Sequence, residues 1–302
     1  MKRIITLAGL LISLQLLAQD GKGKTPVEIF SSEKAINANT TELTGKGKMD
    51  FKITHNFDDV GGSRGGIRNF FGLDNTTDVR IAFIVGVGKN LDVFASRAKG
   101  AGNITRLIET GFKYRFIQQT EDNSVPLSLA LFVNNTISTM PESGFPTDEN
   151  YFLDFSDRTS QVFQLIAAKK IGKVSIQLNP TFLNQGHVVP NDDKTLFALG
   201  GALRIPLSSR FNLIVDYFHS FRSKSSKSFF NTSQGIKFYD PLGIGLEIIT
   251  GRHVFHLNFT NAREILENRF LPKTISSWGK GEFRWGFNLS RKFSLWKEKQ
   301  KK

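Results

Sequence analysis

The sequence has no cysteine and few aromatic residues other than Phe, with only 4 Tyr and 3 Trp in 302 residues. The missing cysteine excludes disulfides, Cys-ligated zinc, iron–sulfur clusters, a Cys nucleophile and lipid attachment at Cys. Apolar residues are also sparse, because hydrophobic residues make up 39% of the chain and its mean hydropathy is −0.20. This composition excludes a polytopic helical membrane protein, which is far more apolar.

Phe, Gly and positive charge are what the sequence has in excess. It contains 28 Phe and 27 Gly, and 40 Lys+Arg against 27 Asp+Glu give a formal net charge of +13. Such a charge first suggests nucleic acid as a partner. The basic residues are spread over the whole chain, however, and the N-terminus indicates export, so we expect no nucleic-acid partner.

Residues 1–18 have the pattern of a secretory signal peptide. Two basic residues precede a mostly apolar stretch that ends at Leu17, and Ala18 is a plausible cleavage point. The stretch is too short for a permanent membrane anchor, which needs about 20 residues. We therefore predict an exported chain, with a flexible polar N-terminal segment over residues 19–47 and a basic C-terminal tail over residues 297–302.

From Met49 onward, apolar and polar residues alternate with a period of two. In residues 78–88, for example, Ile81 and Phe83 alternate with Arg80, which is typical of a strand between two different environments. The pattern recurs often enough to predict twelve strands. Their predicted spans are 49–57, 78–88, 91–97, 104–118, 126–138, 158–170, 173–183, 194–205, 210–219, 234–250, 253–261 and 280–293.

The connections between these strands alternate between long and short. Residues 58–77 and 139–157 are long connections, whereas 89–90 and 251–252 have the size of hairpin turns. Strict alternation places all the long loops at one end of an up-and-down antiparallel sheet. We predict an all-β fold, a transmembrane β-barrel over residues 48–296 with long external loops and short periplasmic turns.

The two faces of the strands differ in a way that indicates which one meets lipid. One face is rich in Phe, Leu, Ile and Val, and the opposite face carries charges. The interior of a twelve-stranded barrel can hold charged side chains and water, whereas a β-sandwich or lipocalin turns its apolar face inward. Long strands, loop asymmetry, the signal peptide and the Phe excess favour the membrane protein. The predicted lumen-lining residues are Lys52, Arg80, Glu109, Lys113, Arg115, Arg204, Asp216, Glu247, His256 and Arg284.

Closure of the barrel is also expected from the physics of the bilayer. An open sheet edge in hydrocarbon leaves a row of unsatisfied backbone groups, at several kcal/mol each. The last strand, 280–293, should therefore pair with the first, over residues 50–57.

Several stretches of the chain together resemble a known family. Their order and spacing are similar to an uncharacterised family of Gram-negative outer-membrane β-barrels, known only as a domain of unknown function. The resemblance covers roughly residues 49–221, and the Phe-Gly-Leu-Asp run at 71–74 is its most distinctive part. It implies a barrel fold and an outer-membrane location, and it supplies no activity and no functional residues. The stretches are DFKITHNFDDVGG (50–62), FFGLDNTTDVRIAFIVGVGKNLDV (70–93), PLSLALF (126–132), QLIAAKKIGKVSIQLNPTF (164–182) and FALGGALRIPL (197–207).

No enzymatic or metal-binding motif withstands a geometric test. His219 and Ser220 invite comparison with the Ser/His pair of outer-membrane phospholipases, but adjacent strand residues point to opposite faces. His253 and His256 are three apart, which also separates them on a strand. The Gly-rich run 61–66 lacks the Lys-Ser/Thr ending and the following helix of a phosphate-binding loop. We expect no catalytic residue, metal or cofactor.

The sequence leaves three functional hypotheses open. The leading one is a passive outer-membrane barrel, a narrow channel or transport component for small solutes, with anions favoured by a surplus of inward Lys and Arg. The second is a non-conducting barrel whose long loops bind a partner or help to assemble a surface complex. The third is a soluble periplasmic β-sandwich or lipid carrier. The expected partners are outer-membrane lipid, lipopolysaccharide and, during biogenesis, the barrel-assembly machinery; no protein partner is indicated.

Overall fold

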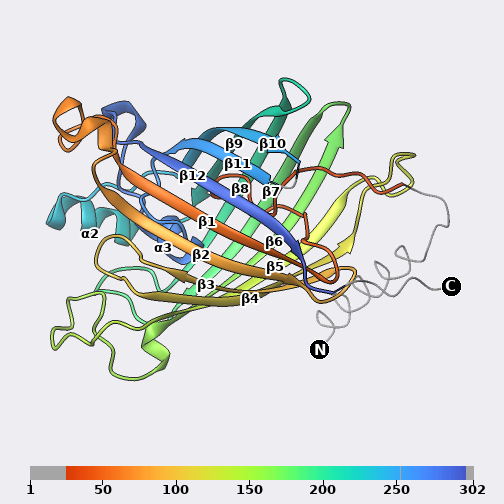
Figure 1. Cartoon of the computed structure of the whole chain (residues 1–302). Helices are drawn as coiled ribbons and strands as arrows, with labels where there is room; N and C mark the ends of the chain where they lie inside the picture. The colour runs from red at the N-terminus through yellow and green to blue at the C-terminus, as the bar shows by residue number, and fades with distance from the viewer. Residues whose placement is uncertain (1–24, 252, 297–302) are drawn as a thin grey trace.

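Within residues 25–251 and 253–296, which the computed structural model describes, twelve antiparallel strands form a closed barrel (Figure 1). Each strand pairs with its neighbours in the sequence, and β12 pairs with β1. The predicted signal peptide and the predicted C-terminal tail lie outside the described residues. The strands are β1 (Lys48–Asp59), β2 (Thr76–Gly86), β3 (Leu91–Ala98), β4 (Leu107–Ile117), β5 (Ser128–Ser138), β6 (Thr159–Ile171), β7 (Val174–Gln185), β8 (Thr195–Pro206), β9 (Phe211–Ser220), β10 (Leu242–Thr250), β11 (His253–Thr260) and β12 (Arg284–Ser294).

The predicted closure of the sheet is confirmed. The β1–β12 ladder runs from the pair Lys48↔Ser294 to the pair Asn56↔Gly286, with a register shift before Asp59. A closed ladder satisfies the backbone groups of all the strands without a free edge, as a barrel in hydrocarbon requires.

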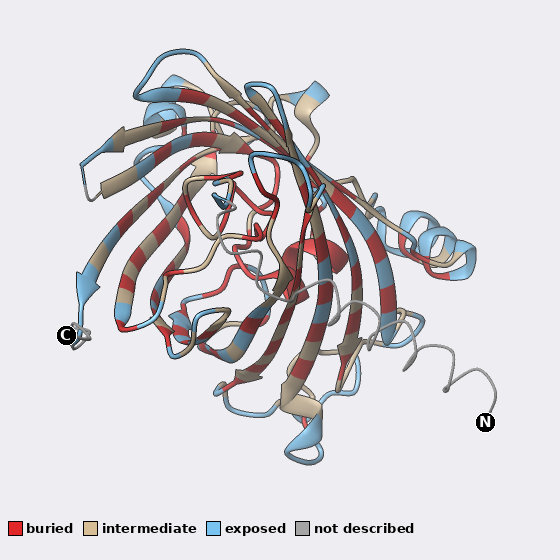
Figure 2. Cartoon of the chain, turned by 90° about the vertical axis from the view of Figure 1, so that its right-hand side faces the viewer, coloured by how far each residue is buried: buried red, intermediate tan, exposed pale blue. Residues whose placement is uncertain are grey.

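The alternation of faces is confirmed as well. Along most strands buried and exposed residues alternate (Figure 2). Many of the exposed strand residues are large and apolar. Phe83 is 48% exposed, Leu178 58% and Phe197 62%, although all three are strongly apolar. Such an outward band suits the hydrocarbon of a bilayer, so the soluble β-sandwich or lipid carrier is excluded. Separately, no helix in the described residues is long and apolar enough to cross a membrane.

The largest difference from the predicted strands concerns residues 234–241. The tenth strand was expected to begin at residue 234, but β10 begins at Leu242, and helix α2 (Lys224–Gln234) precedes it. Ser223 caps this helix by accepting a hydrogen bond from the backbone N–H of Ser226, and Gly235, with a φ of 64°, ends it. Residues 235–241 between the helix and β10 are irregular, and Pro241, which has no backbone N–H to donate to a ladder, directly precedes β10.

Long and short connections lie at opposite ends of the barrel, as predicted. The long connections contain η1 (Ile67–Gly72), η2 (Ser156–Arg158), α2, α3 (Glu267–Lys273) and η3 (Trp278–Lys280). We call this the external end. The short connections, such as residues 172–173 and 207–210, form the periplasmic end.

Residues 25–47, which we call the inserted hairpin, fill the inside of the barrel (Figure 2). The hairpin enters beside the β4–β5 connection, where Val27 N–H donates to Gln119 O at 2.8 Å. It turns at residues 33–40 and leaves beside the β2–β3 connection, where Gly47 N–H donates to Gly86 O at 2.8 Å. The predicted flexibility of residues 19–47 is therefore wrong for the described part, because a polar segment can be solvated by the polar wall of a lumen instead of by water.

A second segment enters from the external end. Helix α3 lies inside the barrel against β6, β7 and β9, and both Glu267 and Phe270 are completely buried. The ring of Phe270 packs at 5.4 Å, edge to face, against that of Phe218. The side chain of Lys34, near the tip of the inserted hairpin, reaches Glu267 at 2.7 Å. The hairpin and α3 thus meet inside the barrel and close it from both ends.

Apolar contacts also hold the hairpin in place. Ile29 and Phe30 belong to one buried cluster with the wall residues Phe94, Phe132 and Phe218. Complete burial of a side chain of this size contributes about 1.5–3 kcal/mol. The lumen therefore contains a packed core, whereas the sequence predicted charged side chains and water.

Candidate functional site

The ten residues predicted to line the lumen all project from strands, and nine of them are at most 9% exposed. Arg115 is the half-buried exception. They do not line open water, because the inserted hairpin and the external loops cover them. Some of them hold the hairpin, and the others form ion pairs along the wall.

Asp216 on β9 is the main anchor for the tip of the hairpin. One of its carboxylate oxygens accepts the backbone N–H groups of Ile36, Asn37 and Ala38, at 3.0, 2.5 and 2.8 Å. The other oxygen accepts the side-chain amide of Asn37 at 3.0 Å. Four donors on one buried carboxylate fix both the position and the conformation of the tip.

The cations of β1 and β4 hold the two arms of the hairpin. Lys52 Nζ lies 2.8 Å from Glu33 Oε1 and donates to Ser32 Oγ at 2.9 Å. Lys113 Nζ donates to the backbone oxygens of Glu33 and Glu42, at 3.0 and 3.1 Å. These contacts replace water around charges that would otherwise be buried without partners.

The remaining predicted residues pair mostly with each other. Arg80 Nη2 lies 2.7 Å from Glu109 Oε2. Glu247 accepts from Arg204 Nε at 2.7 Å and contacts His256 Nε2 at 3.3 Å. Arg204 also donates to Ser31 Oγ of the hairpin at 2.8 Å. In the same way, Arg284 pairs with Asp59 of β1.

The predicted surplus of inward positive charge is wrong. Among the described strand residues, five buried basic side chains face seven buried acidic ones. Four of these acids were not predicted. Asp50, Asp78 and Asp92 have the inward phase of their strands, whereas Asp59 follows the register shift in β1 and lies beyond the predicted strand. The basic residues are Lys52, Arg80, Lys113, Arg204 and Arg284, and the acidic ones are Asp50, Asp59, Asp78, Asp92, Glu109, Asp216 and Glu247.

Side-chain amides of β6 and β7 also form hydrogen bonds with the inserted hairpin. Asn39 O accepts from the side chains of Gln177 and Asn179, both at 2.8 Å. Asn39 in turn donates to Gln164 at 3.2 Å and to Glu267 at 3.0 Å. Asn39 thereby links the wall, the hairpin and α3.

A cavity of about 600 Å³, which we call the external chamber, opens at the external end. Five of the six long connections contribute to it, and its size is that of a small-molecule site. One side is apolar and aromatic, with Phe229, Phe230 and Phe238; the other carries the cations Arg263, Arg269 and Lys273.

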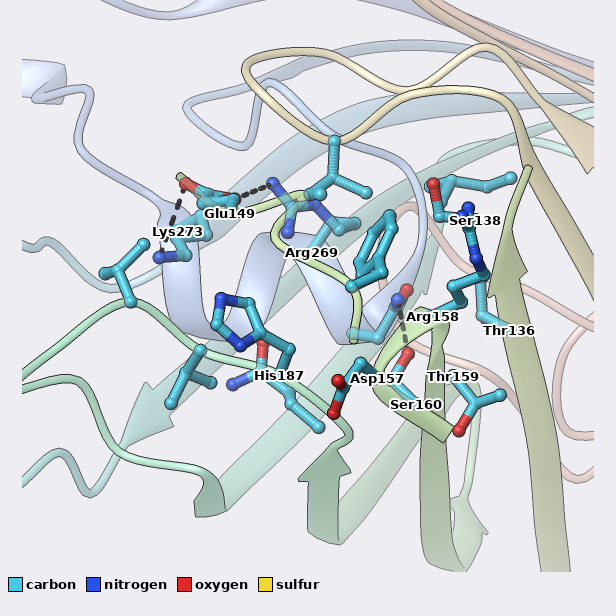
Figure 3. A pocket seen from close by; sticks show the side chains of 17 residues that line it. Thr136, Ser138, Glu149, Asp157, Arg158, Thr159, Ser160, His187, Arg269 and Lys273 are labelled. Atoms are coloured by element: carbon cyan, nitrogen blue, oxygen red, sulfur yellow. Dashed lines mark hydrogen bonds and ion pairs between the residues drawn. The ribbon is translucent and has the colours of Figure 1, made fainter. Parts of the chain in front are cut away.

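A smaller cavity of about 40 Å³ adjoins the chamber, between α3 and the ends of β5 and β6 (Figure 3). Glu149, Arg269 and Lys273 line both cavities and separate them. Glu149 lies 2.9 Å from Arg269 Nη2 and 3.5 Å from Lys273 Nζ. Burial raises the pKa of Glu149, but the two cations outweigh it and lower the pKa to about 2. This ion-paired group is a closed polar barrier below the chamber.

Glu264 is a buried acid at the edge of the chamber. It accepts the N–H of Ala101 at 3.0 Å and lies 3.6 Å from Arg269. Burial raises its pKa to about 7, and the nearby charges of Asp78 and Glu149 act in the same direction, against the effect of Arg269. Glu264 therefore changes charge near neutral pH.

A third cavity, of about 20 Å³, lies deeper, beside the hairpin. Its lining includes Glu33, Lys34, Arg80 and Lys113. On β5 its lining residue is Phe132, whereas Thr136 and Ser138 line the smaller cavity, so this third cavity lies farther from the external end.

The histidines behave as the strand geometry predicts. His219 Nδ1 contacts Asp240 Oδ2 at 2.8 Å, whereas Ser220 Oγ donates to Leu271 O at 2.9 Å, so the two do not form a Ser/His pair. His256 is buried and contacts Glu247, while His253 is half-buried. Among the described residues, no three or more His, Asp or Glu side chains are grouped to hold a metal ion.

The sequence matches a known protein family over most of its length. A family profile described as "Membrane bound beta barrel domain (DUF5777)" matches residues 30–293. The chain belongs to this family. The matched region begins within the inserted hairpin and ends in β12, so most of the hairpin is part of the family's domain.

Solved structures with a similar fold are outer-membrane barrels. An outer membrane channel from Pseudomonas putida F1 is 11% identical, with 84% of this chain and 97% of that chain covered and a TM-score of 0.46. OmpF of Salmonella typhi, in a complex with daunomycin, is 8% identical, with 82% and 96% covered and a TM-score of 0.38. A mutant of the TodX monoaromatic hydrocarbon channel is 8% identical, with 89% and 95% covered and a TM-score of 0.39. The curated proteins contain no match.

Proposed function

We propose that this protein is an outer-membrane transport barrel for small solutes, closed in the described state by its own inserted hairpin. The observation that carries the proposal is the charged wall behind the hairpin. Lys52, Lys113 and Asp216 hold hairpin groups now, and water could take the same places if the hairpin left. A barrel built only as a scaffold has no use for a charged inner wall beneath a separable segment.

The cavities support a transport path with two barriers. A solute would enter the external chamber, pass the Glu149 ion pairs and then the Lys34–Glu267 contact, and leave past the displaced hairpin. The nearly balanced charge of the wall gives no reason for the wall itself to select anions. Around the barrel, outer-membrane lipid would contact the exposed apolar band.

Conductance in planar bilayers tests this proposal. The wild-type protein should conduct rarely, because the hairpin is held by both apolar and charged contacts. A variant that lacks residues 27–44 should open much more often than the wild type, because only the barrier of Glu149, Arg269 and Lys273 then remains. Heat-modifiable migration on SDS gels would verify that the deleted variant still forms a closed barrel. A folded variant that stays silent would overturn the proposal.

A disulfide lock gives a second, reversible test. A Cβ built on Gly243 would lie 2.9 Å from Ile36 Cγ2 and 2.7 Å from Asp216 Oδ1, so the Asp216 carboxylate would have to shift slightly to admit it. The Cβ atoms of residues 36 and 243 are therefore no more than about 4.4 Å apart, within the range of a disulfide. Because the chain has no cysteine, Ile36→Cys with Gly243→Cys would form one defined bond. Oxidation should abolish the rare openings and reduction should restore them, while either single variant should not respond to the redox state.

The occupied lumen also favours a second candidate, a non-conducting barrel whose external loops bind a partner. This function requires the loops but not the removal of the hairpin. A silent, folded deletion variant would support it, particularly if deletion of the external loops abolished partner binding and left barrel folding intact.

A further inference from the structure

The aromatic side of the external chamber consists of three Phe rings that pack against one another. The ring centroids of Phe229 and Phe230 lie 5.5 Å apart and those of Phe230 and Phe238 lie 5.3 Å apart, both pairs edge to face. Helix α2, which carries the first two rings, is docked through Ser223, whose N–H and hydroxyl both donate to Asp193 at 2.7 Å. Phe230 is only 5% exposed, and Arg222 Cζ lies 3.8 Å from the centre of the Phe238 ring. The parts of the three rings that remain uncovered form a fixed apolar surface in the lining of the chamber.

The cationic side lies next to these rings. Lys273 Nζ is 6.0 Å from the centre of the Phe230 ring, and Arg269 is about one turn earlier on the same helix. Arg269 is 5% exposed, and its Nε, like that of Arg263, is buried with no hydrogen-bond acceptor in reach among the described residues. A buried guanidinium N–H without an acceptor is energetically costly. A ligand that supplied an acceptor to these groups would recover that cost.

The geometry points to an amphipathic carboxylate as the ligand of the external chamber. We propose that its carboxylate accepts hydrogen bonds from Arg263 and Arg269, and that its apolar body lies on Phe229, Phe230 and Phe238. The chamber, at about 600 Å³, has room for such a molecule. The proposal deepens the proposed function by naming a solute class, and binding alone can test it.

The acids of the chamber do not favour a cationic ligand. Glu149 is already neutralised between Arg269 and Lys273, and Asp148 accepts a hydrogen bond from Ser143 of its own loop. Glu264, with its pKa raised by burial to about 7, is largely uncharged in mildly acidic solution. Under those conditions the residues that line the chamber include three cations and two charged acids. Behind the lining, Asp192 pairs with both Lys273 and Arg222, so positive charge is still in excess, which favours an anion.

Calorimetry on the full-length protein in lipid nanodiscs can test the proposal at pH 6, with empty nanodiscs as the blank. The probe is 4-phenylbutyrate, compared with 4-phenylbutanol and 4-phenylbutylamine, which have the same apolar body but no negative charge. We expect the carboxylate to bind at least about tenfold more tightly than the alcohol and the amine, which corresponds to about 1.4 kcal/mol. Equal binding of the three compounds would overturn the proposal.

Variants locate the site. Arg263→Gln should weaken binding of the carboxylate about tenfold and leave binding of the alcohol unchanged. Phe229→Ser should weaken binding of both compounds. Arg64→Gln is the matched control, because Arg64 is an exposed arginine of the β1–β2 loop, which does not line the chamber. Carboxylate binding that is insensitive to both chamber variants would place it elsewhere and refute the site.

The two proposals fail separately. Binding that is lost in Arg263→Gln, together with a silent hairpin-deleted barrel, would keep the ligand site and discard transport. An open channel in the deleted variant without preference for the carboxylate would keep transport and discard this ligand class.

Discussion

The hydrogen bonds between the tip of the inserted hairpin and Asp216 give the most quantitative prediction. Asp216→Ala removes the acceptor of three buried backbone N–H groups, those of Ile36, Asn37 and Ala38. Each hydrogen bond to a charged group contributes about 1.5–3 kcal/mol, and water entering the space left by the side chain recovers part of it. We therefore expect the seated hairpin to lose about 3–4 kcal/mol. At 1.4 kcal/mol per factor of ten, the unseated population should rise about 10²- to 10³-fold.

The assay follows the exposure of a single thiol. Ser32 is 3% exposed in the hairpin, and Ser32→Cys would introduce the only cysteine of the chain with little change in volume. Maleimide labelling of folded protein should be slow in this background and about 10²- to 10³-fold faster when Asp216→Ala is added. Asp154→Ala is the control, because this exposed carboxylate accepts hydrogen bonds within its own external loop. Equal labelling rates for Asp216→Ala and the control, in barrels with normal heat-modifiable migration, would refute the reasoning.

Three further predictions concern other parts of the molecule. The pKa of Glu264 is raised to about 7, so the protein should lose stability progressively as the pH rises from about 4.5 to 7, by roughly 3 kcal/mol in total. Thermal unfolding of Glu264→Gln in detergent should therefore depend less on pH than that of the wild type, and an unchanged pH profile would contradict this. Lys34→Ala leaves Glu267 buried without its cation, which should destabilise the inserted hairpin by about 3–5 kcal/mol and speed thiol labelling at residue 32. The double variant Lys34→Met with Glu267→Leu should restore slow labelling, and equal labelling rates in the two variants would argue against the ion pair. Leu178→Lys, on the outward apolar face of β7, should destabilise the barrel in lipid by about 2–4 kcal/mol, as measured by urea titration. Leu207→Lys, in a periplasmic turn, should cost about 1 kcal/mol or less. Equal effects of the two variants would show that the apolar band does not face hydrocarbon.

The barrel itself could be predicted from the sequence because lipid and lumen impose opposite demands on alternate residues. In β2, Arg80 and Phe83 show this directly, since one is buried inside and the other is exposed outside. A period of two indicates a strand and also shows which of its residues share a face. The alternation of long and short loops indicates the up-and-down topology. The start of β10 was missed because Ile236, Lys237 and Phe238 alternate between apolar and polar residues as in a strand.

The inserted hairpin could not be predicted from its composition. A polar stretch such as residues 25–47 is equally suited to water and to a polar lumen. The wall nevertheless carried a signal, because Phe94, Phe132 and Phe218 have the inward phase and a water-filled lumen would leave them exposed. Inward bulky residues on several strands therefore indicate that something packs inside the barrel.

The external chamber was invisible for a different reason. It is assembled from five connections that are far apart in the sequence, so no spacing relates Glu149 to Arg269 or either of them to Phe238.

Both arms of the inserted hairpin leave the barrel at the same end, beside the β4–β5 and β2–β3 connections. The segment is therefore not threaded through the barrel, and it can be withdrawn without breaking a single strand pair. A force applied to Thr25 along the barrel axis would load its contacts one after another, first Val27 with Gln119, then Ile29 with Ser175, and only then the tip at Asp216. Sequential loading needs far less force than shearing all contacts together, so the hairpin is mechanically weak in one direction, toward the periplasm.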